Sequence, residues 1–164
     1  MKIIVAVSNS WGIGKDNKLL FSLKEDMKFF KSTTTGKIVV MGKNTFLSLP
    51  KRPLKDRINI VLSSSMLADE CIKVGDMDEL FELLGEFNTD DVFIIGGASM
   101  YKQMLPYCDT AYITKVHADA EADAFFTNLD ELPDWECVCQ TNVEDTHPIT
   151  FCTYKNKNPM EYKL

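Results

Sequence analysis

Short apolar runs rich in β-branched residues alternate along this chain with segments of helical periodicity, and this alternation constrains the fold more than any other feature. The predicted strands are residues 2–8, 38–41, 58–62, 71–74, 92–95 and 110–116, and the predicted helices are 24–34, about 43–49, 77–84 and 98–105. Beyond residue 130, two strand-like runs, 134–142 and 149–156, follow each other without a helix. The sequence therefore predicts an α/β fold, with a central, mostly parallel twisted sheet, an antiparallel C-terminal edge hairpin and helices on both faces.

The size and charge of the chain restrict its class. Its 164 residues, 45% hydrophobic and 26% charged, predict a single domain, 1–164, with a proper core. It contains no apolar run of the roughly 20 residues that a membrane span needs. The first residues lack a signal-peptide pattern, so we expect a cytoplasmic protein without a membrane partner. A net charge of −6 argues against broad binding to nucleic acid, but leaves room for a local basic pocket for a small anion.

The cysteines and histidines do not form a metal-binding or disulfide pattern. No Cys-x-x-Cys pair occurs, and the five cysteines are Cys71, Cys108, Cys137, Cys139 and Cys152. Buried free thiols in a reducing compartment fit this pattern better than a disulfide framework. In a regular strand, Cys137 and Cys139 are expected on one face. The two histidines, His117 and His147, have no cysteine at ligand spacing, so we expect no metal.

A carboxylate on the apolar edge of the first predicted helix is the leading catalytic candidate. From Ser22 onward, the spacing of Leu23, Met27 and Phe30 predicts one buried stripe, with lysines on the opposite side. Asp26 breaks this pattern, because its neighbours one turn away are apolar. Such a carboxyl is costly to ionise, so we expect a raised pKa that suits proton transfer near neutral pH. The alternative is that Asp26 caps the helix or lies at the rim of the core.

Three predicted strand ends carry groups that suit phosphate. In parallel sheets, ligands bind beyond the carboxyl ends of the strands. There the chain has Gly42-Lys43-Asn44-Thr45, Ser63-Ser64 and Gly96-Gly97-Ala98-Ser99. Each alone has a structural explanation, and neither a Gly-x-Gly-x-x-Gly nor a P-loop motif occurs. Together they suggest a long, multiply charged ligand such as a dinucleotide.

Two other features, the segment 9–18 and Arg57, each allow two interpretations. Residues 9–18 form a long polar link between a strand and a helix, and such loops are often functional lids. Trp11 and Ile13 either anchor this loop or cover a ligand. Arg57, just before a predicted strand, is either a surface residue or a bidentate clamp for a ligand carboxylate.

The motifs together closely resemble those of bacterial, single-domain dihydrofolate reductase, over nearly the whole chain. The residues that carry the resemblance are Ala6; Ile13-Gly14 and Asn17; Glu25-Asp26-Met27-Lys28-Phe29-Phe30-Lys31; Val40-Met41-Gly42-Lys43-Asn44-Thr45-Phe46; Arg52-Pro53-Leu54 with Arg57; Asn59-Ile60-Val61-Leu62-Ser63; Ile94-Ile95-Gly96-Gly97 with Tyr101; Tyr112-Ile113-Thr114; and Asp123-Ala124-Phe125-Phe126. Their order and spacing make it highly specific. It implies NADPH-dependent reduction of dihydrofolate to tetrahydrofolate for one-carbon metabolism, in a monomer that binds antifolate inhibitors.

The resemblance also implies roles for individual residues. Asp26 would hydrogen-bond the pterin ring and promote protonation of N5, with Thr114 as its hydroxyl partner, while hydride passes from NADPH to the adjacent pterin carbon. The implied folate pocket consists of Ile4, Val5, Met27, Phe30, Leu49, Leu54 and Arg57, with Arg57 as the clamp for the glutamate carboxylate. The implied cofactor residues are Ala6, Ile13, Leu19, Ile95 and Tyr101 at the nicotinamide, and Gly42, Lys43, Asn44, Thr45, Ser63, Ser64, Gly96, Gly97, Ala98, Ser99 and Met100 elsewhere. The family pattern also predicts a cis bond between Gly96 and Gly97.

Three departures from the family pattern modify these expectations. Leu20-Phe21 replaces Pro-Trp, which removes an indole N–H that could hold a water bridge to the substrate. Lys43 and Ser99 stand where arginine occurs in relatives, so we expect a weaker preference for NADPH over NADH. Ala122 replaces a glycine in a loop beside residues 9–18, so we expect altered loop dynamics.

Two rival functions remain. A pyrimidine reductase of riboflavin synthesis resembles this family and uses NADPH, but we expect it to lack the helix carboxylate and the arginine clamp, whereas Asp26 and Arg57 are both present. A non-catalytic nucleotide- or antifolate-binding module is disfavoured because Asp26 and Thr114 are retained together. NADPH consumption with dihydrofolate, and binding of dihydrofolate, distinguish these readings.

Overall fold

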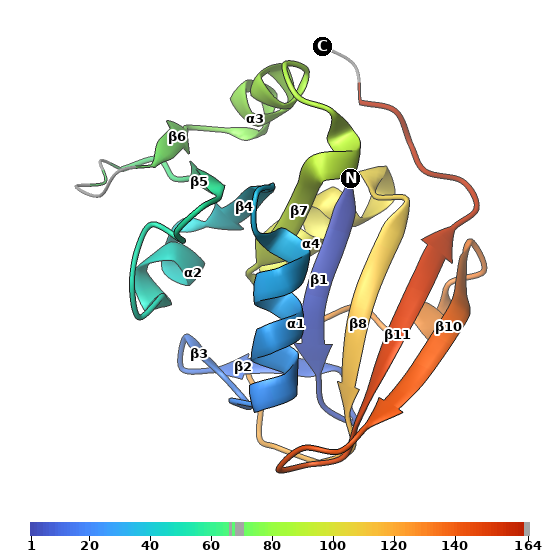
Figure 1. Cartoon of the computed structure of the whole chain (residues 1–164). Coiled ribbons are helices and arrows are strands. Elements are labelled where there is room, and N and C mark those ends of the chain that lie inside the picture. Colours follow the sequence, from blue (N-terminus) through green and yellow to red (C-terminus); the bar gives the residue numbers. More distant parts are fainter. Residues whose placement is uncertain (66, 68–70, 163–164) are drawn as a thin grey trace.

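The chain folds around one large twisted sheet with the strand order β10–β11–β8–β1–β7–β4–β5–β6. Figure 1 shows it in a computed structural model, of which residues 1–65, 67 and 71–162 are described here. The strands are Lys2–Val7 (β1), Ile38–Gly42 (β4), Ile58–Leu62 (β5), Ile72–Val74 (β6), Val92–Gly96 (β7), Thr110–Val116 (β8), Trp135–Val143 (β10) and Ile149–Asn156 (β11). Strands β8, β1, β7, β4, β5 and β6 pair in parallel, and β11 pairs antiparallel with both β8 and β10. The predicted fold class is confirmed.

Helices cover both faces of the sheet because its central strands alternate apolar residues between them. The α-helices are Lys24–Thr34 (α1), Met77–Leu84 (α3), Ala98–Met104 (α4) and the short Lys43–Ser48 (α2); single 3₁₀ turns are Thr89–Asp91 (η1), Leu105–Tyr107 (η2) and Leu129–Glu131 (η3). In β4, Val40 packs in the same core cluster as Leu80 of α3. The next residue, Met41, instead packs with Phe46 of α2. Both faces are therefore buried around β4.

Residues 9–18 were predicted as a long polar loop, and this prediction is only partly correct. They contain the short strands Gly12–Lys15 (β2) and Lys18–Leu19 (β3), which form a second sheet with Ala124–Phe125 (β9). A Cβ on Gly12 would lie only 2.7 Å from the Cβ of Ala122, so glycine is what lets the two segments approach. The Asp16 amide also donates to the Asp123 carboxylate at 3.1 Å. The first loop is therefore held by a segment about a hundred residues later.

The predicted buried stripe on α1 is only partly correct. Leu23 is buried against Val116 and Ile149, but Met27 is 60% exposed. In Figure 1, helix α1 lies in front of the sheet, beside β1. The residue of α1 that is fully buried is Thr34, whose hydroxyl donates to the Phe30 carbonyl at 2.8 Å.

A β-bulge corrects the expectation that Cys137 and Cys139 share a face. Cys137 pairs with Tyr154, whereas Cys139 pairs with the next residue of β11, Thr153, so Val138 is the extra residue. The insertion turns Cys139 to the opposite face, where it is exposed, while Cys137 packs against the core. The expectation of buried thiols holds for Cys108 and Cys152, whereas Cys71 and Cys137 are only partly buried and Cys139 is exposed.

Candidate active site

A carboxyl–hydroxyl pair lies where helix α1 meets strand β8. Asp26 is the third residue of α1, and the Thr114 hydroxyl donates to its Oδ1 at 2.7 Å. Burial raises the pKa of the Asp26 carboxyl; the hydrogen bond from Thr114 opposes this, and the charge of Asp145 adds to it. Asp26 Oδ2 has no hydrogen-bond partner among the described side chains and backbone groups. A ligand can therefore meet an acid poised to hold its proton at higher pH than an ordinary aspartate.

Strand β1 and helix α4 form the floor beside this pair. Ala6 of β1 is aligned with Thr114 of β8, and Ile4 precedes it by two residues on the same face. The buried Tyr101 hydroxyl donates to the Ile4 carbonyl at 2.9 Å. Burial, reinforced by the charge of Asp26, raises the pKa of Tyr101 far above its usual range. Tyr101 therefore stays neutral and acts as a fixed hydrogen-bond donor to the backbone.

The glycine turn after β7 forms a tight cradle with Thr45. The Gly96–Gly97 peptide bond is cis, as the resemblance predicts, and Gly96 has a φ of +133°. A Cβ on Gly96 would lie 3.3 Å from Thr45 Oγ1, and one on Gly97 would lie 3.2 Å from the same atom. Side chains at either position would press on the Thr45 hydroxyl. The missing side chains therefore leave the backbone open to a ligand at the carboxyl ends of β4 and β7.

A cation and a set of hydroxyls meet at the ends of β4 and β5. Lys43 Nζ donates to Ser65 Oγ at 2.7 Å, and the Ser63 hydroxyl donates to the Ser65 carbonyl at 3.0 Å. Ser64 is exposed between them. Ser63 and Ser64 were predicted from the sequence to bind phosphate, but Ser65 was not, although it continues the same run of serines. The group contains the donors that an anionic phosphate requires.

The residues predicted for the folate pocket come from α1, β1 and the stretch 49–57 between α2 and β5. Arg57 donates from Nη1 to the Thr34 hydroxyl at 3.0 Å and lies 5.8 Å from the Phe30 ring centre. Leu49, Leu54 and Ile95 pack against the buried cluster around Phe46. Ile4 and Val5 are buried in β1. These contacts fix Arg57 beside the C-terminal end of α1, one helix length from Asp26.

Other predicted site residues are either exposed or held by contacts outside this group. Leu19 is 84% exposed at the end of β3, and Met100 is buried in the core cluster under α4. Ser99 Oγ accepts from Gln103 within α4 at 3.0 Å. Ile13 is buried in the first-loop sheet, and Asn44 is exposed on α2. Their assignment therefore rests on the family pattern rather than on mutual contacts.

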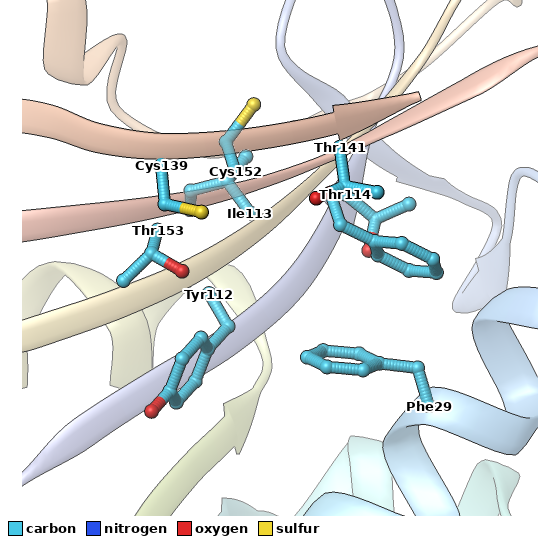
Figure 2. A pocket seen from close by; sticks show the side chains of 9 residues that line it. Phe29, Tyr112, Ile113, Thr114, Cys139, Thr141, Cys152 and Thr153 are labelled. Carbon is cyan, nitrogen blue, oxygen red and sulfur yellow. The ribbon is translucent and has the colours of Figure 1, made fainter. Parts of the chain in front are cut away.

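Two hollows of similar size each include predicted site residues in their lining. One, about 250 Å³, is lined by the predicted cofactor residues Ala98, Ser99 and Tyr101 together with residues of the 125–127 segment. The other, about 260 Å³, lies between α1 and the face of β8, β11 and β10, where Phe29 and Tyr112 point toward each other (Figure 2). Of its lining residues only Thr114 belongs to the predicted site.

Within the described residues, no group of three or more His, Cys, Asp or Glu side chains is arranged to hold a metal ion. Across the same part of the chain, no helix has both the length and the apolarity to cross a membrane.

Comparison with known proteins agrees with this geometry. A sequence profile of the family described as dihydrofolate reductase matches residues 1–156. The dihydrofolate reductase of Schistosoma mansoni is 37% identical over 94% of this chain and 95% of that one, and the enzyme of Bacillus subtilis is 34% identical over 96% and 95%. A solved structure, dihydrofolate reductase from Enterococcus faecalis complexed with NADP(H) and RAB-propyl, superposes with a TM-score of 0.87, at 29% identity and 96% coverage of both chains.

Proposed function

The chain belongs to the dihydrofolate reductase family, and from this premise we propose how its own residues carry out the reaction. Members of the family reduce dihydrofolate to tetrahydrofolate with NADPH, and this chain is an NADPH-dependent oxidoreductase of that kind. The observation that carries the residue assignment is the hydrogen bond between Thr114 and Asp26 at 2.7 Å. It supports a single half-buried acid at the substrate cleft.

Asp26 takes part in the protonation of the substrate. Its Oδ1 is occupied by the Thr114 hydroxyl, which leaves Oδ2 to hydrogen-bond the pterin ring. Because burial raises its pKa, the carboxyl retains a proton at higher pH than an exposed aspartate and promotes protonation of N5. Thr114, itself buried on β8, fixes the orientation of the carboxyl. Arg57, held over Phe30, binds the glutamate carboxylate of the substrate.

The remaining assigned residues fit NADPH. The cofactor supplies the hydride when it is bound. The cradle of Gly96, Gly97 and Thr45 allows backbone to approach a pyrophosphate, because a Cβ at either glycine would occupy that space. Lys43, together with Ser63, Ser64 and Ser65, provides one cation and several hydroxyl donors for the 2′-phosphate. Lysine contributes a point charge rather than a bidentate fork, which supports the expected weaker discrimination against NADH.

Several broader assignments follow from the same family relationship. We propose that residues 1–164 act as one domain, as a monomer in the cytoplasm that binds antifolate inhibitors but neither nucleic acid nor membrane. The supporting observation for one domain is that β1 lies between β7 and β8, so the first strand joins the sheet halves. The supporting observation against nucleic acid is the net charge of −6. Sedimentation velocity of the purified chain tests the monomer.

The deciding experiment is NADPH consumption with dihydrofolate across pH, in the wild type and in Asp26→Asn. We expect rapid turnover that falls as pH rises, because the protonated carboxyl is lost. Asp26→Asn is expected to lose at least about 100-fold at neutral pH, the usual scale for removing a general acid. Its activity should be partly recovered at low pH, where solvent supplies the proton.

Glu25→Gln is the matched control, because Glu25 is the neighbouring carboxylate on α1 and pairs with Lys28 at 3.5 Å instead of facing the cleft. We expect this variant to keep the wild-type pH profile. A wild type that binds NADPH but leaves dihydrofolate unreduced would contradict the folate assignment and support the pyrimidine reductase. An Asp26→Asn variant as active as the wild type would leave the reaction in place but remove Asp26 from it.

A further inference from the structure

Helix α1, which carries Asp26, has no cap of its own. Its N-cap residue is Leu23, whose side chain makes no capping hydrogen bond. Helix α3 shows the usual arrangement, since its N-cap Asp76 accepts from the Glu79 amide at 2.9 Å. An uncapped N-terminus leaves backbone N–H groups without intrahelical partners. At α1 these groups must be satisfied from elsewhere.

The partner comes from the turn between β10 and β11. Asp145 Oδ2 accepts from the Glu25 amide at 2.7 Å, and the Lys24 amide also contributes to this carboxylate. His147 of the same turn meets the Phe21 ring edge-on, with 5.5 Å between centroids. Leu23, which lies between Phe21 and Glu25 in the sequence, is buried against Val116 of β8 and Ile149 of β11. The turn therefore contacts the segment 21–25 on both sides of the buried Leu23, at the Phe21 ring before it and at the Glu25 amide after it.

We propose that Asp145 is a positioning residue for Asp26, which closes the free end of α1 from the β10–β11 turn and places a negative charge there. This inference rests on the proposed function, because it assigns Asp145 to the same acid. Asp26 is the third residue of α1, where the positive end of the helix dipole favours the ionised carboxylate. The charge of Asp145 lies at that same end and opposes the effect.

The other groups around Asp26 do not supply this charge. On α1 itself, Glu25 is paired with Lys28 at 3.5 Å. From α4 the neutral Tyr101 faces the site, and from β8 the Thr114 hydroxyl donates to it. His147, on the same turn as Asp145, contacts Phe21. The effect of Asp145 on the pKa of Asp26 is upward, in the same direction as the larger effect of burial.

The test separates charge from capping. Asp145→Asn keeps an oxygen that accepts from the Glu25 amide but removes the charge, whereas Asp145→Ala removes both. Glu144→Gln is the matched control, because it removes the same charge from the adjacent exposed residue of the turn. Two readouts are needed at low salt, where the interaction is least screened. They are the pH profile of kcat with dihydrofolate, and a titration of the Asp26 side-chain carboxyl by ¹³C NMR without ligands.

We expect Asp145→Asn to unfold within about 2 °C of the wild type, with the carboxyl titration of Asp26 and the kcat profile both moved to lower pH. On the alkaline side, kcat should fall about two- to threefold, because less of the acid is protonated. The KM for dihydrofolate should change little. Asp145→Ala should show the same displacement and a Tm lower by about 2–4 °C, the scale of a lost helix cap in a chain of this size.

Superposition of the Asp145→Asn and wild-type Asp26 titrations would overturn the proposal, as would an equal displacement in Glu144→Gln. These outcomes are distinct from failure of the proposed function. If the wild type does not reduce dihydrofolate, the function fails, but the NMR titration still decides whether Asp145 acts on Asp26. A Tm loss in Asp145→Ala without any displacement in Asp145→Asn would reduce Asp145 to a structural cap.

Discussion

Asp26 lies in a place where its charge opposes folding. Burial raises the pKa of its carboxyl above the ordinary value for an aspartate, so the folded chain holds this proton at pH values where the unfolded chain has released it. The stability that Asp26 provides is therefore greatest below the unfolded pKa and declines as pH rises through the folded pKa. The same environment that favours the protonated acid, which its proposed role requires, reduces the stability of the protein at neutral pH.

Asp26→Asn is accordingly expected to stabilise the fold while it removes activity. Asparagine keeps an oxygen for the Thr114 hydroxyl but carries no charge. At pH 8 we expect a Tm about 2–4 °C above that of the wild type, the equivalent of about 1 kcal/mol for a chain of this length. The gain should shrink as pH approaches 4, where the wild-type carboxyl is protonated. Thermal unfolding at several pH values checks this; a gain that is constant with pH would contradict it.

Lys43 is the residue through which we expect the cofactor preference to be set. Its ammonium group lies 2.7 Å from Ser65 Oγ, beside the hydroxyls assigned to the 2′-phosphate. Lys43→Ala should raise the KM for NADPH about tenfold, the scale of one charge-assisted hydrogen bond, and leave the KM for NADH nearly unchanged. Lys31→Ala, an exposed lysine on α1, is the control. Equal effects on both cofactors would place Lys43 outside the 2′-phosphate site.

At the scale of elements, the large strands and helices were predicted well because each carries its own apolar period. The strand Thr110–Val116 and the helix Met77–Leu84 were both predicted with their observed bounds. Strands β2 and β3 were missed because they are only four and two residues long and are defined by β9, far along the chain. The bulge at Val138 was missed for a similar reason, since only pairing with β11 reveals it.

Residues of the site divide in the same way, into those that a local pattern predicts and those that only tertiary contacts reveal. Asp26 and the direction of its pKa could be predicted, because the apolar neighbours that bury it lie within one helical turn. Ser65 was overlooked although it continues a run of serines. Asp145 could not be found from the sequence, because it lies 120 residues from the Glu25 amide that it binds. Contacts made through tertiary structure alone leave no local pattern to read.

The close approach of Gly12 in β2 to Ala122, just before β9, predicts that substitutions at these two positions are coupled in stability. Gly12→Ala would place a Cβ 2.7 Å from that of Ala122, so one segment must move away. Ala122→Gly should recover much of the resulting loss, giving a coupling of about 1 kcal/mol in a double-mutant cycle of urea unfolding. Strictly additive effects of the two substitutions would show that the segments do not constrain each other. Turnover of the same four proteins reports whether the contact also governs the first loop.

At the scale of the whole molecule, the chain beyond β11 runs past the end of the sheet where β1 begins, towards helix α3 (Figure 1). The Met160 amide donates to the Pro106 carbonyl at 2.8 Å. The Tyr162 ring then stacks on Phe81 of α3, with 4.8 Å between centroids, and meets Tyr107 edge-on at 6.2 Å. This tail connects the antiparallel hairpin with the helices on the face opposite the acid. It contributes to stability at a distance from the reaction.

Tyr162→Ala should therefore lower stability without changing the chemistry. Losing one stacked ring and part of its buried surface is expected to cost about 1–2 kcal/mol, which corresponds to a Tm lower by about 2–8 °C. Tyr162→Phe keeps the ring and should retain most of the wild-type Tm, because the contacts with Phe81 and Tyr107 are made by the ring. The kcat and its pH profile should be unchanged in both variants, since Asp26 and Thr114 lie on the other face of the sheet. A change in the pH profile of Tyr162→Ala would mean that the tail is coupled through the sheet to the acid, and unchanged unfolding would mean that the aromatic stack does not hold the tail in solution.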